Sequence, residues 1–180
     1  MVAFKHTKRI SDTYDESILS AIGTLMLTAA LTETALTLIC VRLLSHPKPM
    51  QPGVLFAVQG TEFRSKLYLI TQTCDAHFQQ HAADIKRQCK KIERAFLKRN
   101  LFAHGLIDKT PTGDKLAIAF VKNITYGHDN AIQIVTAKEI QSYSQNIEDR
   151  VRALDNLLTK AGVHMYELDQ QDRPADSARQ

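Results

Sequence analysis

The segment from Ser17 to Val41 constrains the fold of this chain more than any other, because it is long, apolar and almost uncharged. Its single charged residue is Glu33. Apolar side chains recur at helical spacing along it and just beyond it, at Ile18, Ile22, Leu25, Ala29, Leu36, Ile39 and Leu43. Ser11 or Asp12 can cap a helix that runs to about Leu44. The rest of the chain must therefore supply helices that cover this one.

A membrane span is the other structure that such a segment can form. Its hydroxyl side chains and a glycine make it too polar to fill a bilayer comfortably, and Glu33 would place a carboxylate inside it. The start of the chain also lacks the apolar run of a signal peptide. We therefore expect a buried helix in a cytoplasmic protein that makes no membrane contact.

Composition fits one soluble domain. The 180 residues are 44% hydrophobic and 23% charged, which is ordinary for a globular protein. The formal net charge of +4 and the sequence pI near 9.0 permit a nucleic-acid partner without requiring one. Cys40, Cys74 and Cys89 are odd in number and widely spaced, which favours a reducing compartment.

Helical periodicity continues through most of the chain. After a proline-rich loop at 45–53, a second helix is predicted over 54–81, with Phe56, Gly60, Phe63, Leu67, Ile70 and Cys74 on one face. A third is predicted over 83–104, with Ile85, Cys89, Ile92 and Phe96 as its core stripe and Gly105 as its stop. A last helix is predicted from the capping box of Thr136 and Glu139 to about Ala161, with Ile140, Ile147, Val151, Leu154 and Leu158 as its core face.

Residues 115–135 interrupt the helical pattern. They are rich in Ile, Val, Phe and Thr around the turn residues 127–130, which predicts a β-hairpin. The expected fold is thus mainly α: a bundle of about four long helices with one β-hairpin between the third and the fourth. It occupies a single domain at 11–165, after an N-terminal arm at 1–10 and before a polar tail at 166–180 that we expect to be disordered.

The residues that carry chemistry lie at the end of the third predicted helix, in the sequence Arg99-Asn100-Leu-Phe-Ala-His104-Gly. Arginine holds a permanent cation that can bind two phosphate oxygens, and histidine can transfer protons near neutral pH. Next to a strongly basic helix, this pair suggests RNA cleavage. Five residues of helix turn by roughly 500°, which leaves about 140° between the two side chains. Either the helix ends or distorts near Gly105, or a second copy of the chain completes the site.

This heptapeptide, at the end of a basic helix in a helical bundle, resembles the HEPN superfamily. The family signature is Arg, a polar residue, three to five further residues, and His, which Arg99, Asn100 and His104 match in order and spacing. The resemblance covers roughly residues 12–161, but only the heptapeptide is specific.

The resemblance implies a metal-independent endoribonuclease of a toxin–antitoxin, abortive-infection or other defence system. It implies a homodimer in which the two Arg–His motifs meet, no cofactor and no metal, and an antitoxin or defence protein as a further partner. His104 would act as general base or acid on RNA, and Arg99 would neutralise the charge of the transition state. The family also contains members that bind RNA or a nucleotide without catalysis, so a non-catalytic RNA- or protein-binding dimerisation module is the alternative, and a purely structural role is a third.

Three further features have two readings each. Glu33 either pairs with Arg99 or orients His104, or it is a solvated residue on an exposed strip. The stripe on the third helix formed by Arg87, Lys91, Arg94 and Lys98 either binds RNA phosphates or is a solvated face. Cys74, His77 and His81 share a spacing seen in metal ligands, but no fourth ligand is evident, and we expect a core edge that reaches a polar helix end instead.

Overall fold

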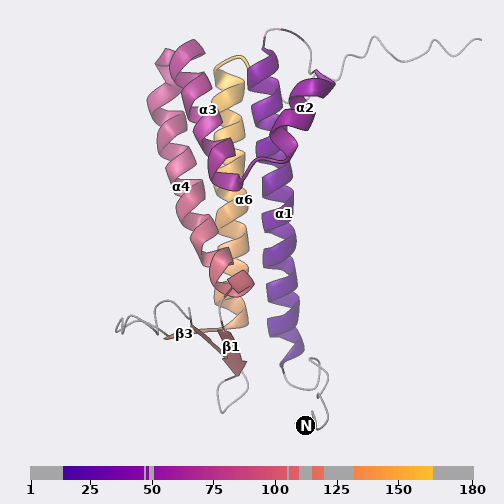
Figure 1. The fold of residues 1–180 in the computed structure, drawn as a ribbon. Helices are drawn as coiled ribbons and strands as arrows, with labels where there is room; N and C mark the ends of the chain where they lie inside the picture. The colour runs from indigo at the N-terminus through magenta and orange to yellow at the C-terminus, as the bar shows by residue number, and fades with distance from the viewer. Residues whose placement is uncertain are drawn as a thin grey trace, which may run out of the picture.

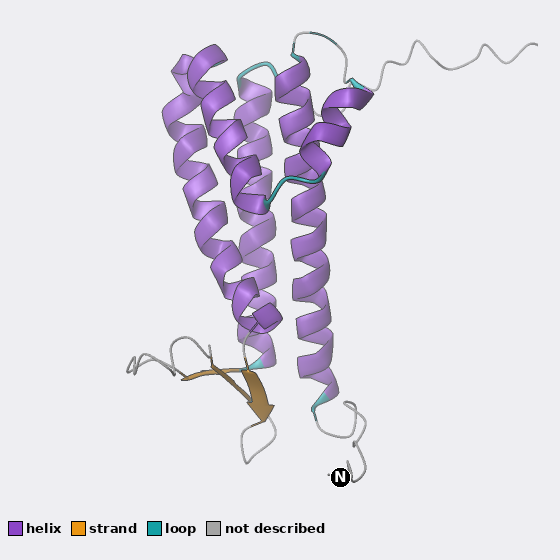
Figure 2. Ribbon diagram, viewed as in Figure 1, coloured by secondary structure: helices purple, strands orange, loops and turns teal. Residues whose placement is uncertain are grey.

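The computed structural model describes residues 14–46, 48, 51–104, 106–109, 115–119 and 132–163. Within them the chain is mainly helical, as predicted (Figures 1 and 2). The helices are α1 (Glu16–Ser45), α2 (Pro52–Gln59), α3 (Phe63–His77), α4 (Gln79–His104) and α6 (Ala137–Lys160), and the strands are β1 (Leu106–Lys109), β2 (Leu116–Ala119) and β3 (Ile132–Val135). The predicted arm at 1–10, the hairpin turn at 127–130, the tail at 166–180 and Gly105 lie outside the described residues.

The first helix follows its prediction closely. It ends at Ser45, but its N-cap is Asp15, whose Oδ1 accepts the backbone N–H of Ser17 at 2.8 Å, and not Ser11 or Asp12. The apolar stripe is buried apart from Ile22, which is half-buried. By length and composition alone α1 could cross a membrane, yet half of its most apolar window is buried inside the protein.

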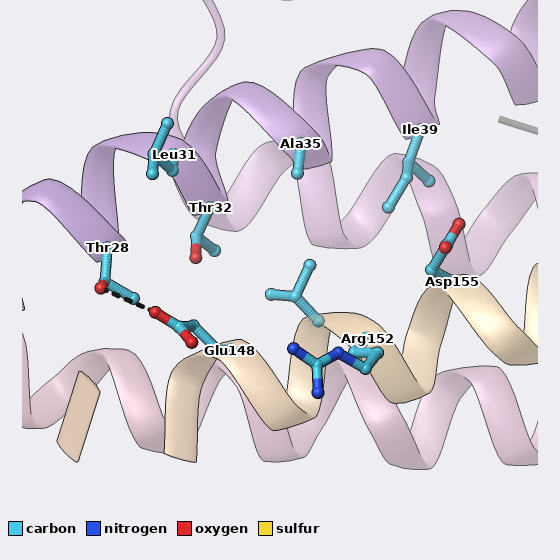
Figure 3. A pocket seen from close by; sticks show the side chains of 9 residues that line it. Thr28, Leu31, Thr32, Ala35, Ile39, Glu148, Arg152 and Asp155 are labelled. Carbon is cyan, nitrogen blue, oxygen red and sulfur yellow. Dashed lines mark hydrogen bonds between the residues drawn. The ribbon is translucent and has the colours of Figure 1, made fainter. Parts of the chain in front are cut away.

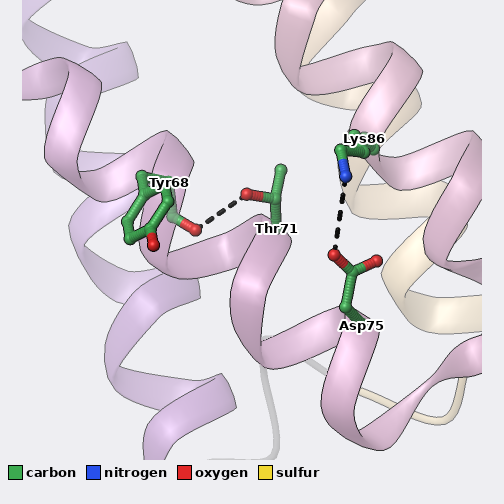
Figure 4. A network of polar contacts seen from close by, with 4 residues as sticks. All are labelled: Tyr68, Thr71, Asp75 and Lys86. Carbon is green, nitrogen blue, oxygen red and sulfur yellow. Dashed lines mark hydrogen bonds and ion pairs between the residues drawn. The ribbon is translucent and has the colours of Figure 1, made fainter.

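The helices form a bundle in which α6 lies against both α1 and α4, and α3 lies against the same two helices. Ion pairs join α3 to α4 on the surface: Lys86 Nζ lies 3.6 Å from Asp75 Oδ2 (Figure 4), and Arg64 Nε lies 3.0 Å from Glu93 Oε1. These pairs are solvent-exposed, so they contribute little stability, about 1 kcal/mol or less each. The packing of the helices depends on the apolar core.

The second predicted helix is wrong as a single element. The chain breaks after Gln59 and restarts at Phe63, and α2 packs on α1 while α3 packs between α1 and α4. Val58 and Leu67 are both buried, yet in one straight helix they would face opposite ways, since nine residues turn by about 900°. Phe56, placed in the predicted core stripe, is 77% exposed. Burial of both Val58 and Leu67 therefore requires the break.

A second break separates α3 from α4 at Phe78, whose backbone (φ −131°, ψ 47°) is not helical. The third predicted helix thus begins earlier than expected, at Gln79, and ends at His104 as predicted. Its predicted core stripe is buried throughout, at Ile85, Cys89, Ile92 and Phe96.

The sheet closes the end of the bundle where α4 finishes and α6 begins. β2 pairs with β3 antiparallel, with Leu116 opposite Val135, which agrees with the predicted pairing. β1 pairs with β2 on its other edge and makes the sheet three-stranded, which was not predicted. A four-residue strand directly after a long helix is too short to show a periodicity of its own.

The core consists of two clusters along the bundle axis. One contains the second half of α1, together with α3 and the first half of α4. The other contains the first half of α1, the end of α4 and the buried side of the sheet. Phe63 packs against both clusters, and its ring stacks on Phe96 with centroids 3.9 Å apart. Phe102 and Leu101, which lie between Arg99 and His104, contribute to the cluster beside the sheet.

Candidate Arg–His site

Arg99 projects from α4 in nearly the direction of the buried Ile92, because seven residues make about two turns. Its guanidinium does not continue inward. Cζ lies 5.8 Å from the centroid of the Phe96 ring, and Nη1 donates a hydrogen bond to Asn100 Oδ1 at 3.3 Å. The side chain therefore crosses the helix toward Asn100, and the cation is turned to that side.

Asn100 and His104 project from the same side of α4, since four residues leave only about 40° between them. Asn100 is half-buried, and His104 is exposed at the last residue of the helix. The helix is regular through both residues, so no distortion brings the motif together. The Arg99 cation lies beside Asn100, whose direction on the helix is between those of Arg99 and His104.

The Arg99 cation has no carboxylate partner among the described residues. Its Nε is buried without a hydrogen-bond partner there. A buried polar N–H that lacks a partner is costly, and an anion that accepts from it recovers that cost. The site is therefore electrostatically suited to an anionic ligand.

The expected pairing of Glu33 with Arg99 is not found. No ion pair or hydrogen bond of the Glu33 carboxylate appears in the described part of the chain, and the residue is half-buried. A carboxylate that reaches water needs no cationic partner, which favours the solvated reading of this residue. Arg99 obtains its neighbours from its own helix instead.

In the described part of the chain, no other helix covers one side of α4 around the motif. α3 starts at Phe63, at the level of Phe96, and extends toward the opposite end of the bundle (Figure 1). α4 continues for about two further turns beyond that level without α3 beside it. Leu97 on this side is 50% exposed, and His104 lies seven residues, about two turns, further along the same side.

The basic stripe is divided in two by its contacts. Arg87 donates to Asp84 Oδ1 at 2.7 Å and is neutralised there. Lys91, Arg94 and Lys98 line an open groove of about 410 Å³ between α4 and α6. The α6 wall of this groove consists of Ser142, Tyr143, Asn146 and Arg150. Sequence reasoning missed these four residues, and no motif marks them; they are found only by the packing of α6 against α4.

A second groove, of about 340 Å³, lies between α1 and α6 (Figure 3). Thr28 Oγ1 donates to Glu148 Oε1 at 3.2 Å across it, and Asp155 Oδ1 is buried without a partner in the described residues. The exposed Leu31 lies at its α1 side. This groove is on the opposite face of α6 from the basic one, since Glu148 and Arg150 are about 200° apart on that helix.

Cys74, His77 and His81 do not form a common helical face, because α3 ends at His77 and Phe78 breaks the helix before His81. Cys74 is buried in the core and His77 is exposed. In the described residues no group of three histidine, cysteine or acidic side chains is placed to hold a metal ion. Burial raises the pKa of Cys40 and Cys89 to about 12 and that of Cys74 to about 11, so all three are neutral thiols of the core.

Comparison with protein-family models, with curated proteins and with solved structures finds no match. The class of protein that the coordinates define is thus a mainly helical bundle with a small antiparallel sheet at one end. Its function has to be argued from the site.

Proposed function

We propose that this protein is a HEPN-like, metal-independent endoribonuclease whose site is built from Arg99, Asn100 and His104. The observation that carries the proposal is the Arg99 guanidinium, which lacks a carboxylate partner in the described chain and lies beside Asn100 on the helix that ends at the exposed His104. A phosphodiester supplies the anion that this cation lacks. The exposed imidazole supplies a group for proton transfer.

In the proposed reaction the 2′-hydroxyl of RNA attacks the adjacent phosphorus. His104 accepts the proton of the 2′-hydroxyl as the general base, or it donates a proton to the departing 5′-oxygen as the general acid. The P–O5′ bond breaks, and the products are a 2′,3′-cyclic phosphate and a 5′-hydroxyl. Arg99 binds the non-bridging oxygens as their charge increases, and Asn100 holds the guanidinium in place.

The second part of the proposal is a homodimer that completes the site. A single His104 can take only one of the two proton-transfer roles at a time, and a second copy supplies another. The side of α4 that α3 does not reach supports this arrangement, because a second copy could pack there against Leu97, which is 50% exposed next to the motif. We place this dimer in the cytoplasm, with an antitoxin or another defence protein as its further partner.

The test is a cleavage assay on single-stranded RNA with His104→Ala and Arg99→Ala. Each variant is expected to lose activity, by about 10²–10⁴-fold for the proton-transfer group and about 10²–10³-fold for the cation. Circular dichroism should show an unchanged helix content, since His104 is exposed and Arg99 is half-buried. Exposed Lys138→Ala serves as the matched control and should cleave at the wild-type rate.

Two results would contradict the nuclease. One is cleavage that persists in His104→Ala, and the other is loss of wild-type cleavage in EDTA. The alternative, a non-catalytic RNA-binding module, is favoured by the basic groove, which does not contain His104. It predicts salt-dependent RNA binding that is indifferent to His104, with no scission at any pH.

A further inference from the structure

The groove between α4 and α6 combines basic residues from two helices that are far apart in the sequence. Lys91, Arg94 and Lys98 of α4 face Arg150 of α6, and no acidic residue lines the groove. In the described part of the chain, Lys91, Arg94 and Arg150 have no ion pair. Four like charges that converge without a carboxylate repel each other, so an anion in the groove is stabilising.

Contacts on either side of the groove hold its walls together. Gln88, buried about one turn before Lys91, donates from Nε2 to the backbone carbonyl of Arg150 at 2.8 Å and ties α4 to α6. Toward the sheet, Lys98 Nζ lies 5.6 Å from the centroid of the Tyr143 ring and donates to Gln133 Oε1 at 3.4 Å. The cations are therefore presented by packed helices, and the groove exists before any ligand binds.

Neutral hydrogen-bonding groups complete the lining. Ser142, Tyr143 and Asn146 come from α6, on the same wall as Arg150. Burial raises the pKa of Tyr143, and the carboxylate of Glu139 raises it further, so its phenol keeps its proton near neutral pH. Hydroxyl and amide groups beside cations suit the non-bridging oxygens of phosphates.

The groove and the Arg–His motif lie on different sides of α4. Lys98 and His104 are six residues apart, which leaves about 120° between their directions on the helix. A phosphate held in the groove is thus not the phosphate beside His104. The groove has a volume of about 410 Å³ and is open to solvent, so it suits a stretch of an extended strand.

We propose that the α4–α6 groove is an anchoring site for the phosphodiester backbone of single-stranded RNA, separate from the Arg–His site. This inference rests on the proposed function in one respect, that RNA is the ligand. Arg150, together with Lys91 and Arg94, binds phosphates of nucleotides that are not cleaved. Such contacts hold the strand without regard to its sequence and make its affinity depend on salt.

The test is binding of a fluorescein-labelled 2′-O-methyl oligouridine, which cannot be cleaved, measured by fluorescence anisotropy at several salt concentrations. The double variant Arg94→Gln/Arg150→Gln should reduce the magnitude of the negative slope of log K against log salt by about 1.4, since each phosphate contact contributes about −0.7 for single strands. With binding equal at 1 M salt, this slope means roughly twenty-five-fold weaker binding at 0.1 M.

The matched control is Lys90→Gln/Lys138→Gln, which removes the same charge from exposed positions outside the groove. It should change the slope by less than half as much. Equal slopes for the two double variants, or an oligonucleotide that does not bind the wild type, would overturn the anchoring site. Because this probe measures binding alone, a wild type that binds through the groove but never cleaves RNA refutes the nuclease and leaves the groove intact.

Discussion

At the scale of single residues, the candidate site depends on where a side chain goes after it leaves the helix. The spacing of Arg99 and His104 predicts directions about 140° apart, and the regular helix through His104 agrees with it. The spacing does not predict that the guanidinium contacts Phe96 and Asn100. The rotamer of a long side chain is set by tertiary packing, so this part of the site could not be read from the motif.

Glu33 shows what sequence periodicity cannot predict about a single residue. Its isolation in an apolar segment indicated a buried partner, but a helix of this length is covered on some sides only, and Glu33 is half-buried. Sequence periodicity shows which residues form the apolar stripe, and it does not show how far neighbouring helices extend. The position of the motif at the end of α4 was thus predictable, and the partial exposure of Glu33, which leaves it unpaired with Arg99, was not.

The three core thiols give a residue-scale prediction about pH. Burial raises the pKa of Cys40, Cys74 and Cys89 above the value of about 8.5 for an exposed thiol. The unfolded chain therefore releases thiol protons from about pH 8.5 upward, whereas the folded chain keeps them until about pH 11–12. The stability that these groups contribute is complete below about pH 8.5 and decreases as the pH rises.

Urea denaturation at a series of pH values from neutral to alkaline measures this effect. A variant with all three cysteines replaced by alanine should start less stable, because it leaves cavities, but lose less stability per pH unit in the alkaline range. Lysines and tyrosines titrate equally in both proteins, so they cancel in the comparison. If the plots of unfolding free energy against pH were parallel for the two proteins, the thiols would not have the raised pKa values that burial gives them.

At the scale of elements, helix interiors were predictable and helix ends were only partly so. The core stripes of α1 and α4 have strong periodicity, and both were found buried. The break between α2 and α3 has no strong local signal: Gly60 has an ordinary backbone (φ −82°, ψ −2°) that any residue can adopt. The requirement to bury both Val58 and Leu67 in the same core cluster decides it, and that requirement exists only in the assembled bundle.

Two glycines at helix ends allow a test of this explanation. Gly60→Ala should change the free energy of unfolding by about 0.5 kcal/mol or less, because a Cβ there meets nothing within 4 Å and the φ is negative. Gly162 follows α6 with a φ of +85°, so Gly162→Ala should cost roughly 1–2 kcal/mol. Chemical denaturation followed by circular dichroism measures both. A large cost for Gly60→Ala would mean that the glycine itself sets the break.

At the scale of the whole molecule, the short α3 leaves the bundle incomplete beside the motif. In the half that holds the sheet, α1, α4 and α6 are present and α3 is not. In a complete helical bundle, apolar side chains are covered on all sides of the core. Leu97, however, is 50% exposed on the side of α4 that α3 does not reach. A second copy of the chain on this side would cover that surface and bring two motifs together.

This arrangement predicts that Leu97→Glu converts a dimer into a monomer. A charge at the interface would be buried without a partner, so dimerisation should weaken strongly, and RNA cleavage should be lost with it. Light scattering measures the mass, and circular dichroism checks the fold. Leu27→Glu is the matched control, since Leu27 is 62% exposed on α1, about one turn before Leu31 and thus near the α1–α6 groove. A Leu97→Glu protein that remains dimeric, or a Leu27→Glu protein that becomes monomeric, would place the interface elsewhere.

The division of the core into two clusters has a consequence for how such chains can diverge. The cluster around α3 contains no residue of the Arg–His heptapeptide, whereas the one beside the sheet includes Phe102 and packs against Leu101 of that heptapeptide. Substitutions in the first cluster can alter the lifetime of the folded chain without displacing Arg99 or His104. Related chains are therefore expected to vary freely in one half of the bundle, with the Phe63–Phe96 stack as the contact through which changes in that half would reach the chemistry.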